Sequence, residues 1–152
     1  LIPSAWDNRF ILNLTAGKKF ERNIELGIKF RYSGGGPYTP LDLATSSIQG
    51  VWNVNQQGVL NYDLLNTERL KNIHGLDVRL DKKWFFNKWS LNAYLDIENM
   101  YNYKIQLPSE IGIDENVGQL IYEAQNSSQY SLYEIVNESG TILPTIGLLI
   151  EF

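Results

Sequence analysis

The last eight residues, TIGLLIEF (145–152), show the pattern that decides the fold. Large apolar residues occupy every second position, at Ile146, Leu148 and Ile150, and the residues between them are small or polar except for Leu149. Alternation of this kind is typical of a β-strand with one apolar face and one polar face. The chain therefore ends, by this pattern, in a two-faced strand.

The same period of two recurs in four further stretches, at 8–20, 23–33, 74–84 and 89–99. In 23–33, for example, isoleucine, leucine, phenylalanine and tyrosine alternate with glutamate, glycine, lysine, arginine and serine. No stretch shows the 3.6-residue period of an amphipathic helix. The sequence predicts an all-β chain with about five antiparallel up-and-down strands.

The connections between these strands alternate in length. KKFERN (18–23) and KKWFFNK (82–88) are short, whereas the connections at 34–72 and 103–140 are long. Structureless loops of more than about 12–15 residues are uncommon in compact soluble domains. Short turns on one side and long loops on the other are typical of an outer-membrane β-barrel, with periplasmic turns and extracellular loops.

Aromatic residues gather where the strands are expected to end. Those near the short turns are Phe20, Trp84, Phe85, Phe86 and Trp89, and those near the long connections are Tyr32, Tyr38, Tyr101 and Tyr103. Membrane barrels carry an aromatic girdle at each interface. An odd number of strands that starts on the long-loop side then places Phe152 at the periplasmic girdle, with its ring toward lipid.

The alternation predicts which side chains share a face. The residues predicted to face lipid are Leu12, Leu26, Ile28, Val78, Leu91, Leu95, Leu148 and Ile150. The residues predicted to face the lumen are Glu25, Lys29, Arg31, Asp77, Arg79, Asp81, Asp96 and Glu98. The charged set could line a permeation path or contact a plug; the simpler interpretation is a mutually neutralising, hydrated wall.

Composition argues against several other classes of site. The 152 residues include no cysteine and one histidine, and the net charge is -4, so thiolate or histidine-cluster metal sites are excluded and a nucleic-acid partner is not favoured. The DEN stretch (114–116) lacks the spacing of a calcium loop. Asp77 and Asp81, or Asp96 and Glu98, could form a glycosidase-like pair, but nearby Arg79 favours salt bridges. We expect no catalytic residue, no metal and no cofactor.

Two short stretches are expected to form turns, and one of them has an alternative interpretation as a ligand contact. In SGGGPYTP (33–40), the three glycines are expected to adopt positive φ and the prolines to stiffen a strand exit, although this stretch could also contact a substrate. Glu138-Ser139-Gly140 is expected to be a turn. His74 is expected near the extracellular interface.

Five stretches taken together resemble the C-terminal end of a TonB-dependent receptor of the Bacteroidetes type. They are FRYSGGGPYTPLD (30–42), GVLNYDLLNTERL (58–70), HGLDVRLDKKWFF (74–86), WSLNAYLDIENMYNY (89–103) and NESGTILPTIGLLIEF (137–152). The motifs are loose individually, whereas their order, spacing and terminal phenylalanine are more specific. Residues 1–152 would then be the C-terminal portion of the barrel, with the plug and upstream strands absent.

The resemblance implies the following expectations. In that family a barrel of about 22 strands encloses a plug and imports a nutrient, with energy relayed by TonB. Phe152 resembles the signal by which the barrel assembly machinery recognises a last strand. The implied location is the outer membrane of a Gram-negative bacterium, and the implied partners are outer-membrane lipid, the rest of the barrel and its plug, the TonB complex and the assembly machinery.

Two alternatives to an importer segment remain open, and the first is a multi-chain pore. Membrane barrels start at about 8 strands, so the five strands need either upstream strands of the same polypeptide, as in an importer, or strands from further copies, as in such a pore. Upstream strands of the same polypeptide are favoured because residues 1–10 lack the basic and apolar segments of an export signal. The other alternative is a soluble β-sandwich binding module, whose apolar face would meet a second sheet.

Overall fold

The computed structural model describes residues 2–152 and divides into two compact units. The sheet unit comprises Arg9–Gly34, Asn72–Ile105 and Gly140–Phe152, and the loop unit comprises 2–8, Gly35–Lys71 and Gln106–Ser139. The sheet unit therefore collects the predicted strands, and the loop unit consists mainly of the two long connections.

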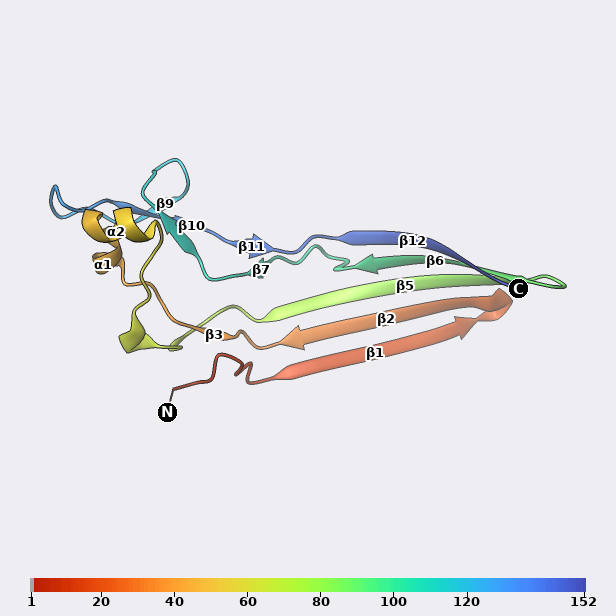
Figure 1. The fold of residues 1–152 in the computed structure, drawn as a ribbon. Coiled ribbons are helices and arrows are strands. Elements are labelled where there is room, and N and C mark those ends of the chain that lie inside the picture. The colour runs from red at the N-terminus through yellow and green to blue at the C-terminus, as the bar shows by residue number, and fades with distance from the viewer. Residues whose placement is uncertain (1) are drawn as a thin grey trace. The chain divides into compact units, whose positions relative to one another are not determined.

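The sheet unit is a single five-stranded antiparallel layer (Figure 1). Its strands, in spatial order, are β1 (Ile11–Phe20), β2 (Ile24–Ser33), β5 (Ile73–Phe85), β6 (Ser90–Glu98) and β12 (Leu143–Glu151). Each strand pairs with the next one of this unit along the chain. The prediction of about five antiparallel up-and-down strands is confirmed, although the chain is mainly β rather than all-β.

The short turns close two of the strand pairs tightly. Between β1 and β2 lies a single 3-10 turn, η1 (Glu21–Asn23), in which Arg22 and Asn23 adopt φ values of 62° and 57°. Between β5 and β6, the amide of Phe86 donates to the carbonyl of Trp89 at 2.9 Å. Residues in the left-handed region of φ and ψ allow a turn of three residues to reverse the chain. Asparagine is among the non-glycine residues that tolerate this conformation best.

The loop unit is folded rather than structureless. Its elements are β3 (Pro37–Tyr38), α1 (Leu43–Ser47), α2 (Gln49–Asn55), η2 (Tyr62–Leu64), β4 (Glu68–Arg69), β8 (Glu110–Gly112), β9 (Gln119–Tyr122), β10 (Leu132–Ile135) and β11 (Glu138–Ser139), and β7 (Ile105–Gln106) lies at the division between the units. β8, β10 and β9 form a three-stranded sheet, and β3 pairs with β4. Glu138 and Ser139, expected in a turn, form β11.

The two helices contradict the expectation that the chain contains none. α1 is capped by Asp42, whose carboxylate accepts hydrogen bonds from the Thr45 amide at 3.0 Å and the Thr45 hydroxyl at 2.6 Å. Capping of this kind satisfies amides that have no partner inside the helix. Helices of five and seven residues are shorter than the window in which a 3.6-residue period can be recognised, and this explains the miss.

The buried hydrophobic core lies in the loop unit. Among the described residues, the hydrophobic core cluster consists of the buried side chains of Trp52 of α2, Ile111 of β8 and Leu132 of β10. The buried Ser46 hydroxyl donates to the carbonyl of Asp42 and accepts from the amide of Val59, so its burial leaves it satisfied. The long connections thus build their own small core.

The glycines of SGGGPYTP do not adopt the positive φ that was expected. In the described residues the one glycine with positive φ is Gly140, at 119°. A Cβ on Gly35 would lie 1.8 Å from the carbonyl oxygen of Leu70, so Gly35 is required because two backbones approach closely. The chain does leave β2 at this stretch, as expected, but Gly35 is needed for close backbone packing rather than for a positive φ.

Candidate functional site

The strand register sorts the sheet into a polar face and an apolar face. On the polar face, the strand register places Glu25 opposite Asp81, Lys29 opposite Asp77, and Arg79 opposite Asp96. Arg31 and Glu98 fall on the same alternation, so the polar face contains Glu25, Lys29, Arg31, Asp77, Arg79, Asp81, Asp96 and Glu98. All the residues that the sequence assigns to the lumen therefore share one face.

Ion pairs link most of these charges. Arg31 contacts Asp77 at 2.8 Å, and Arg79 contacts Asp81 at 2.8 Å and Asp96 at 3.7 Å. The Arg79 guanidinium also lies over the Tyr94 ring, 4.1 Å from its centroid. These contacts join neighbouring strands into a neutralised lattice. In this lattice the carboxylates of Asp81 and Asp96 both contact the Arg79 guanidinium.

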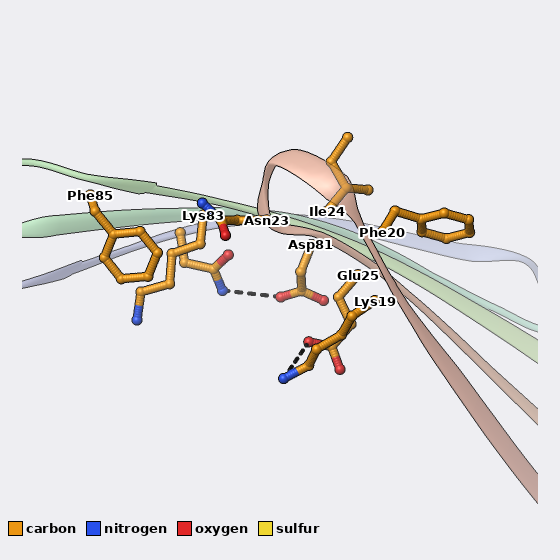
Figure 2. Close-up of a pocket in the computed structure, with 9 residues that line it drawn as sticks. Lys19, Phe20, Asn23, Ile24, Glu25, Asp81, Lys83 and Phe85 are labelled. Atoms are coloured by element: carbon orange, nitrogen blue, oxygen red, sulfur yellow. Dashed lines mark hydrogen bonds and ion pairs between the residues drawn. The ribbon is translucent and has the colours of Figure 1, made fainter.

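A depression of about 510 Å³ lies on the polar face beside the short turns (Figure 2). Within it, Lys19 pairs with Glu25 at 3.5 Å, and the Asn92 amide donates to Asp81 at 3.0 Å. A second, smaller hollow of about 250 Å³, lined by Lys29, Asp77, Arg79, Asp96 and Glu98 among others, lies further along this face. The polar face is thus hollowed and charged along its length, as expected for a surface in contact with water or with a polar partner.

The apolar face contains every residue that the sequence assigns to lipid. Ile28 pairs with Val78, Leu95 with Ile146, and Leu91 with Ile150. The same alternation places Leu12, Leu26, Ile28, Val78, Leu91, Leu95, Leu148 and Ile150 together. Many of these side chains are exposed, Leu148 by 70% and Ile150 by 51%.

Aromatic side chains gather at the end of the sheet where the long connections begin. The His74 ring lies 3.9 Å from the Tyr103 ring centroid and 6.5 Å from that of Tyr32, and His74 Nδ1 lies 2.6 Å from the Tyr101 hydroxyl. Burial, followed by the nearby Tyr103 and Asp77, raises the pKa of Tyr101. This cluster holds Tyr32, Tyr101 and Tyr103 of the predicted girdle together with His74, whereas Tyr38 lies in β3 of the loop unit.

The opposite end of the sheet carries aromatic rings paired with lysines. Lys18 lies over Phe20, Lys82 over Trp84 and Lys83 over Phe85, at 5.2, 5.6 and 5.4 Å from the ring centroids. The rings of Phe86 and Trp89 stack at 4.1 Å. The chain ends beside these turns at Phe152, which is 99% exposed (Figure 1).

The loop unit has a groove that the sequence analysis missed. Its volume is about 570 Å³, and its lining includes Tyr38, Leu60, Pro108, Ile121 and Glu134. The Glu134 carboxylate accepts a hydrogen bond from the Ser109 hydroxyl at 2.6 Å. The residues that line this groove come from two distant stretches of the chain, so no local sequence motif predicts the groove. Residues 38–40 of the lining belong to SGGGPYTP, the stretch with a possible substrate contact.

Metal and membrane-helix features can be described for residues 2–152. In that range no group of three or more histidine, aspartate or glutamate side chains is placed to hold a metal ion. Asp114 instead caps its own turn, accepting from the amide of Asn116, and this hydrogen bond lowers the pKa of Asp114. No helix in the described part of the chain has both the length and the apolarity to cross a bilayer.

The comparisons with known proteins identify no relative. Searches against protein-family models, curated proteins and solved structures found no match.

Proposed function

We propose that the chain forms the C-terminal part of the β-barrel of an outer-membrane TonB-dependent receptor, which imports a nutrient. The apolar face then contacts outer-membrane lipid, the polar face contacts the lumen and plug, and the TonB complex acts through parts of the receptor other than these strands.

The observation that carries this proposal is the exposure of the apolar face. Ile146 is 80% exposed, Leu148 is 70% and Leu80 is 44%, and the strands of the sheet unit form one layer. A contiguous apolar surface of this kind is unusual on a protein surrounded by water. Lipid hydrocarbon is a solvent in which these side chains need no covering layer.

The unpaired edges of the sheet favour a larger closed barrel. Within residues 2–152, β1 hydrogen-bonds to β2 alone and β12 to β6 alone. In hydrocarbon each unpaired backbone group costs several kcal/mol, so further strands must pair with both edges. Those strands belong, in our proposal, to the same receptor; a multi-chain pore would require them from further copies.

The two ends of the sheet also support a membrane-spanning orientation. β1 and β2 are each 10 residues long, which fits the roughly 9–11 residues of a tilted transmembrane strand. Aromatic side chains occur at both ends, as at the two interfaces of a bilayer. A β-sandwich module would instead have a second sheet over the apolar face, and the sheet unit contributes none.

Cysteine labelling of intact cells tests the proposal. The chain contains no cysteine, so Gln57→Cys in the long connection and Asn87→Cys in the short turn each introduce a single reactive site. We expect a membrane-impermeant maleimide to label Cys at 57 in intact cells and to label Cys at 87 only after the outer membrane is permeabilised. Labelling at 87 but not at 57 would invert the orientation, and equal labelling of both in a detergent-free soluble fraction would refute membrane insertion.

A further inference from the structure

The apolar face carries charge at one end only. The register places Lys18 of β1 opposite Leu26, and Lys82 of β5 opposite Ile24 and Ala93, so both lysines belong to the apolar face. No other lysine, arginine, aspartate or glutamate of the five described strands falls on this face. Both lysines lie next to the short turns.

Each of these lysines is followed by a second lysine on the polar face. Lys19 pairs with Glu25 at 3.5 Å, and Lys83 pairs with Glu151 at 2.5 Å. In each of the two Lys-Lys pairs, at 18–19 and 82–83, the first lysine therefore lies on the apolar face and the second on the polar face. On the polar face a carboxylate neutralises each cation.

The lysines of the apolar face have no such partner. In residues 2–152 neither Lys18 nor Lys82 forms an ion pair; Lys18 lies over the Phe20 ring, and Lys82 lies over Trp84 and donates to the carbonyl of Arg22. Two positive charges therefore border an apolar surface without a compensating negative charge.

We propose that Lys18 and Lys82 bind the phosphate of an anionic phospholipid whose acyl chains lie on the apolar face. The proposal rests on the proposed function, since it requires that this face meets lipid. A long lysine side chain can keep its ammonium at head-group depth while its methylenes lie against apolar surface. The two lysines lie over the Phe20 and Trp84 rings, and aromatic side chains are favoured at the membrane interface.

The opposite end of the apolar face has no lysine or arginine that could bind a lipid phosphate. There the side chains are Tyr32 and His74 rather than lysine or arginine; the Tyr32 hydroxyl accepts a hydrogen bond from the Asn72 amide, and His74 Nδ1 lies 2.6 Å from the Tyr101 hydroxyl. Attraction between a basic residue and an anionic lipid surface amounts to about 1 kcal/mol per lysine, which is roughly a fivefold preference. The short-turn end is therefore the end selective for anionic head groups.

Spin-labelled lipids provide the test. The complete receptor that contains this chain is reconstituted in phosphatidylcholine vesicles with a trace of spin-labelled phosphatidylglycerol or spin-labelled phosphatidylcholine, and the motionally restricted fraction of each label is measured by electron paramagnetic resonance. We expect the phosphatidylglycerol label to be enriched about fivefold or more beside the protein. Lys18→Gln with Lys82→Gln should abolish this enrichment.

The neighbouring lysines provide a matched control. Lys19→Gln with Lys83→Gln removes the same charge one residue away, on the polar face, and should leave the enrichment intact. Equal loss in both double variants, or enrichment that survives Lys18→Gln with Lys82→Gln, would overturn the lysine assignment. Enrichment that is abolished by millimolar inorganic phosphate alone would show an ion site rather than a lipid site.

The phosphatidylcholine label separates the two proposals. If it shows a restricted component and the phosphatidylglycerol label shows no preference, the lysine site is refuted and lipid contact stands. If neither label is restricted, the apolar face does not meet lipid, and both proposals fail.

Discussion

The two units of the chain treat apolar side chains in opposite ways. The loop unit buries Trp52, Ile111 and Leu132 among its helices and short strands. The sheet unit, in which the apolar residues are far more regularly patterned, contains no buried hydrophobic side chain among its described residues and leaves Leu148 70% exposed. Regular alternation in this protein therefore accompanies exposure, and irregular sequence accompanies a core.

The difference indicates two solvents. A unit that buries its apolar groups gains the hydrophobic free energy of about 25 cal/mol per Å² removed from water. A single sheet with an open apolar face gains little of that free energy and is suited to an apolar surrounding. Substitutions should therefore follow different rules in the two units.

Trp52→Ala should have the largest effect. Trp52 is 5% exposed in the loop-unit core, and truncation of a buried tryptophan typically costs about 3–5 kcal/mol. Native-state hydrogen exchange of the amides of β8 and β10 measures the loss. Val54→Ala on the same helix, where the side chain is 81% exposed, should change protection by less than about 0.5 kcal/mol; equal effects would mean that the loop unit has no core of its own.

Leu148→Arg should be costly in a bilayer, whereas Leu149→Arg should not. The two leucines are adjacent, but Leu148 pairs with Ala93 on the apolar face and Leu149 with Asn92 on the polar face. Arginine on a lipid face costs about 2–4 kcal/mol near the midplane, and much less on the lumen face. The same cost is expected for arginine at Leu12, Leu26, Ile28, Val78, Leu91 and Leu95 where they lie near the midplane.

Urea titration of the complete protein folded in lipid vesicles measures this difference. The two leucine variants share the native residue, the new residue and the strand, so the comparison isolates the face. If both variants lose the same free energy, the assignment of the two faces to two solvents is wrong.

Asp42→Ala should weaken the loop unit locally. Loss of an N-cap typically costs about 1 kcal/mol, and here it removes both hydrogen bonds to Thr45. Hydrogen exchange of the α1 amides reports the effect, with Asp63→Ala as a control, because the Asp63 side chain caps no helix. Unchanged exchange in α1 would show that packing alone holds this helix.

Acid should reproduce the loss of this cap. The hydrogen bonds from Thr45 lower the pKa of Asp42 in the folded state below its ordinary value of 3.8. A lowered folded-state pKa means that the contribution of Asp42 is fully present above about pH 4 and disappears as pH falls through the folded pKa. In wild type, hydrogen exchange of the α1 amides should speed up as the pH falls through this pKa, and in Asp42→Ala this pH dependence should be absent. If the pH dependence persists in the variant, another group causes it.

Gly147→Ala should have the smallest effect of the four. A Cβ at this position would lie 2.2 Å from Cζ of Tyr94, so the ring must swing away from Arg79. Loss of an exposed cation–π contact costs about 0.5–1 kcal/mol. Gly17→Ala, where the nearest atom would be 3.7 Å away, serves as the control in the same urea titration, and equal stability of the two variants would show that Tyr94 does not depend on its place over Arg79.

The sequence by itself determined the strands and the division of their side chains between two faces. Alternation alone was enough to assign Val78 and Ile28 to one face and Asp77 and Lys29 to the other, because the side chains of a strand point to opposite faces in turn. The short turns could also be predicted, since few residues separate the paired strands. The helices α1 and α2 could not, because one cap and two short segments leave no readable period.

Tertiary structure alone decided which distant residues meet. Trp52 and Leu132 are 80 positions apart in the numbering and share a core, and the closeness of the backbone at Leu70 explains why position 35 must be glycine. The same holds for the charges: the sequence shows two Lys-Lys steps, but only the register shows that Lys19 and Lys83 have carboxylate partners while Lys18 and Lys82 border the apolar face without one. Local patterns specify where a side chain points relative to its own strand, whereas its partner depends on contacts between segments that only the folded chain brings together.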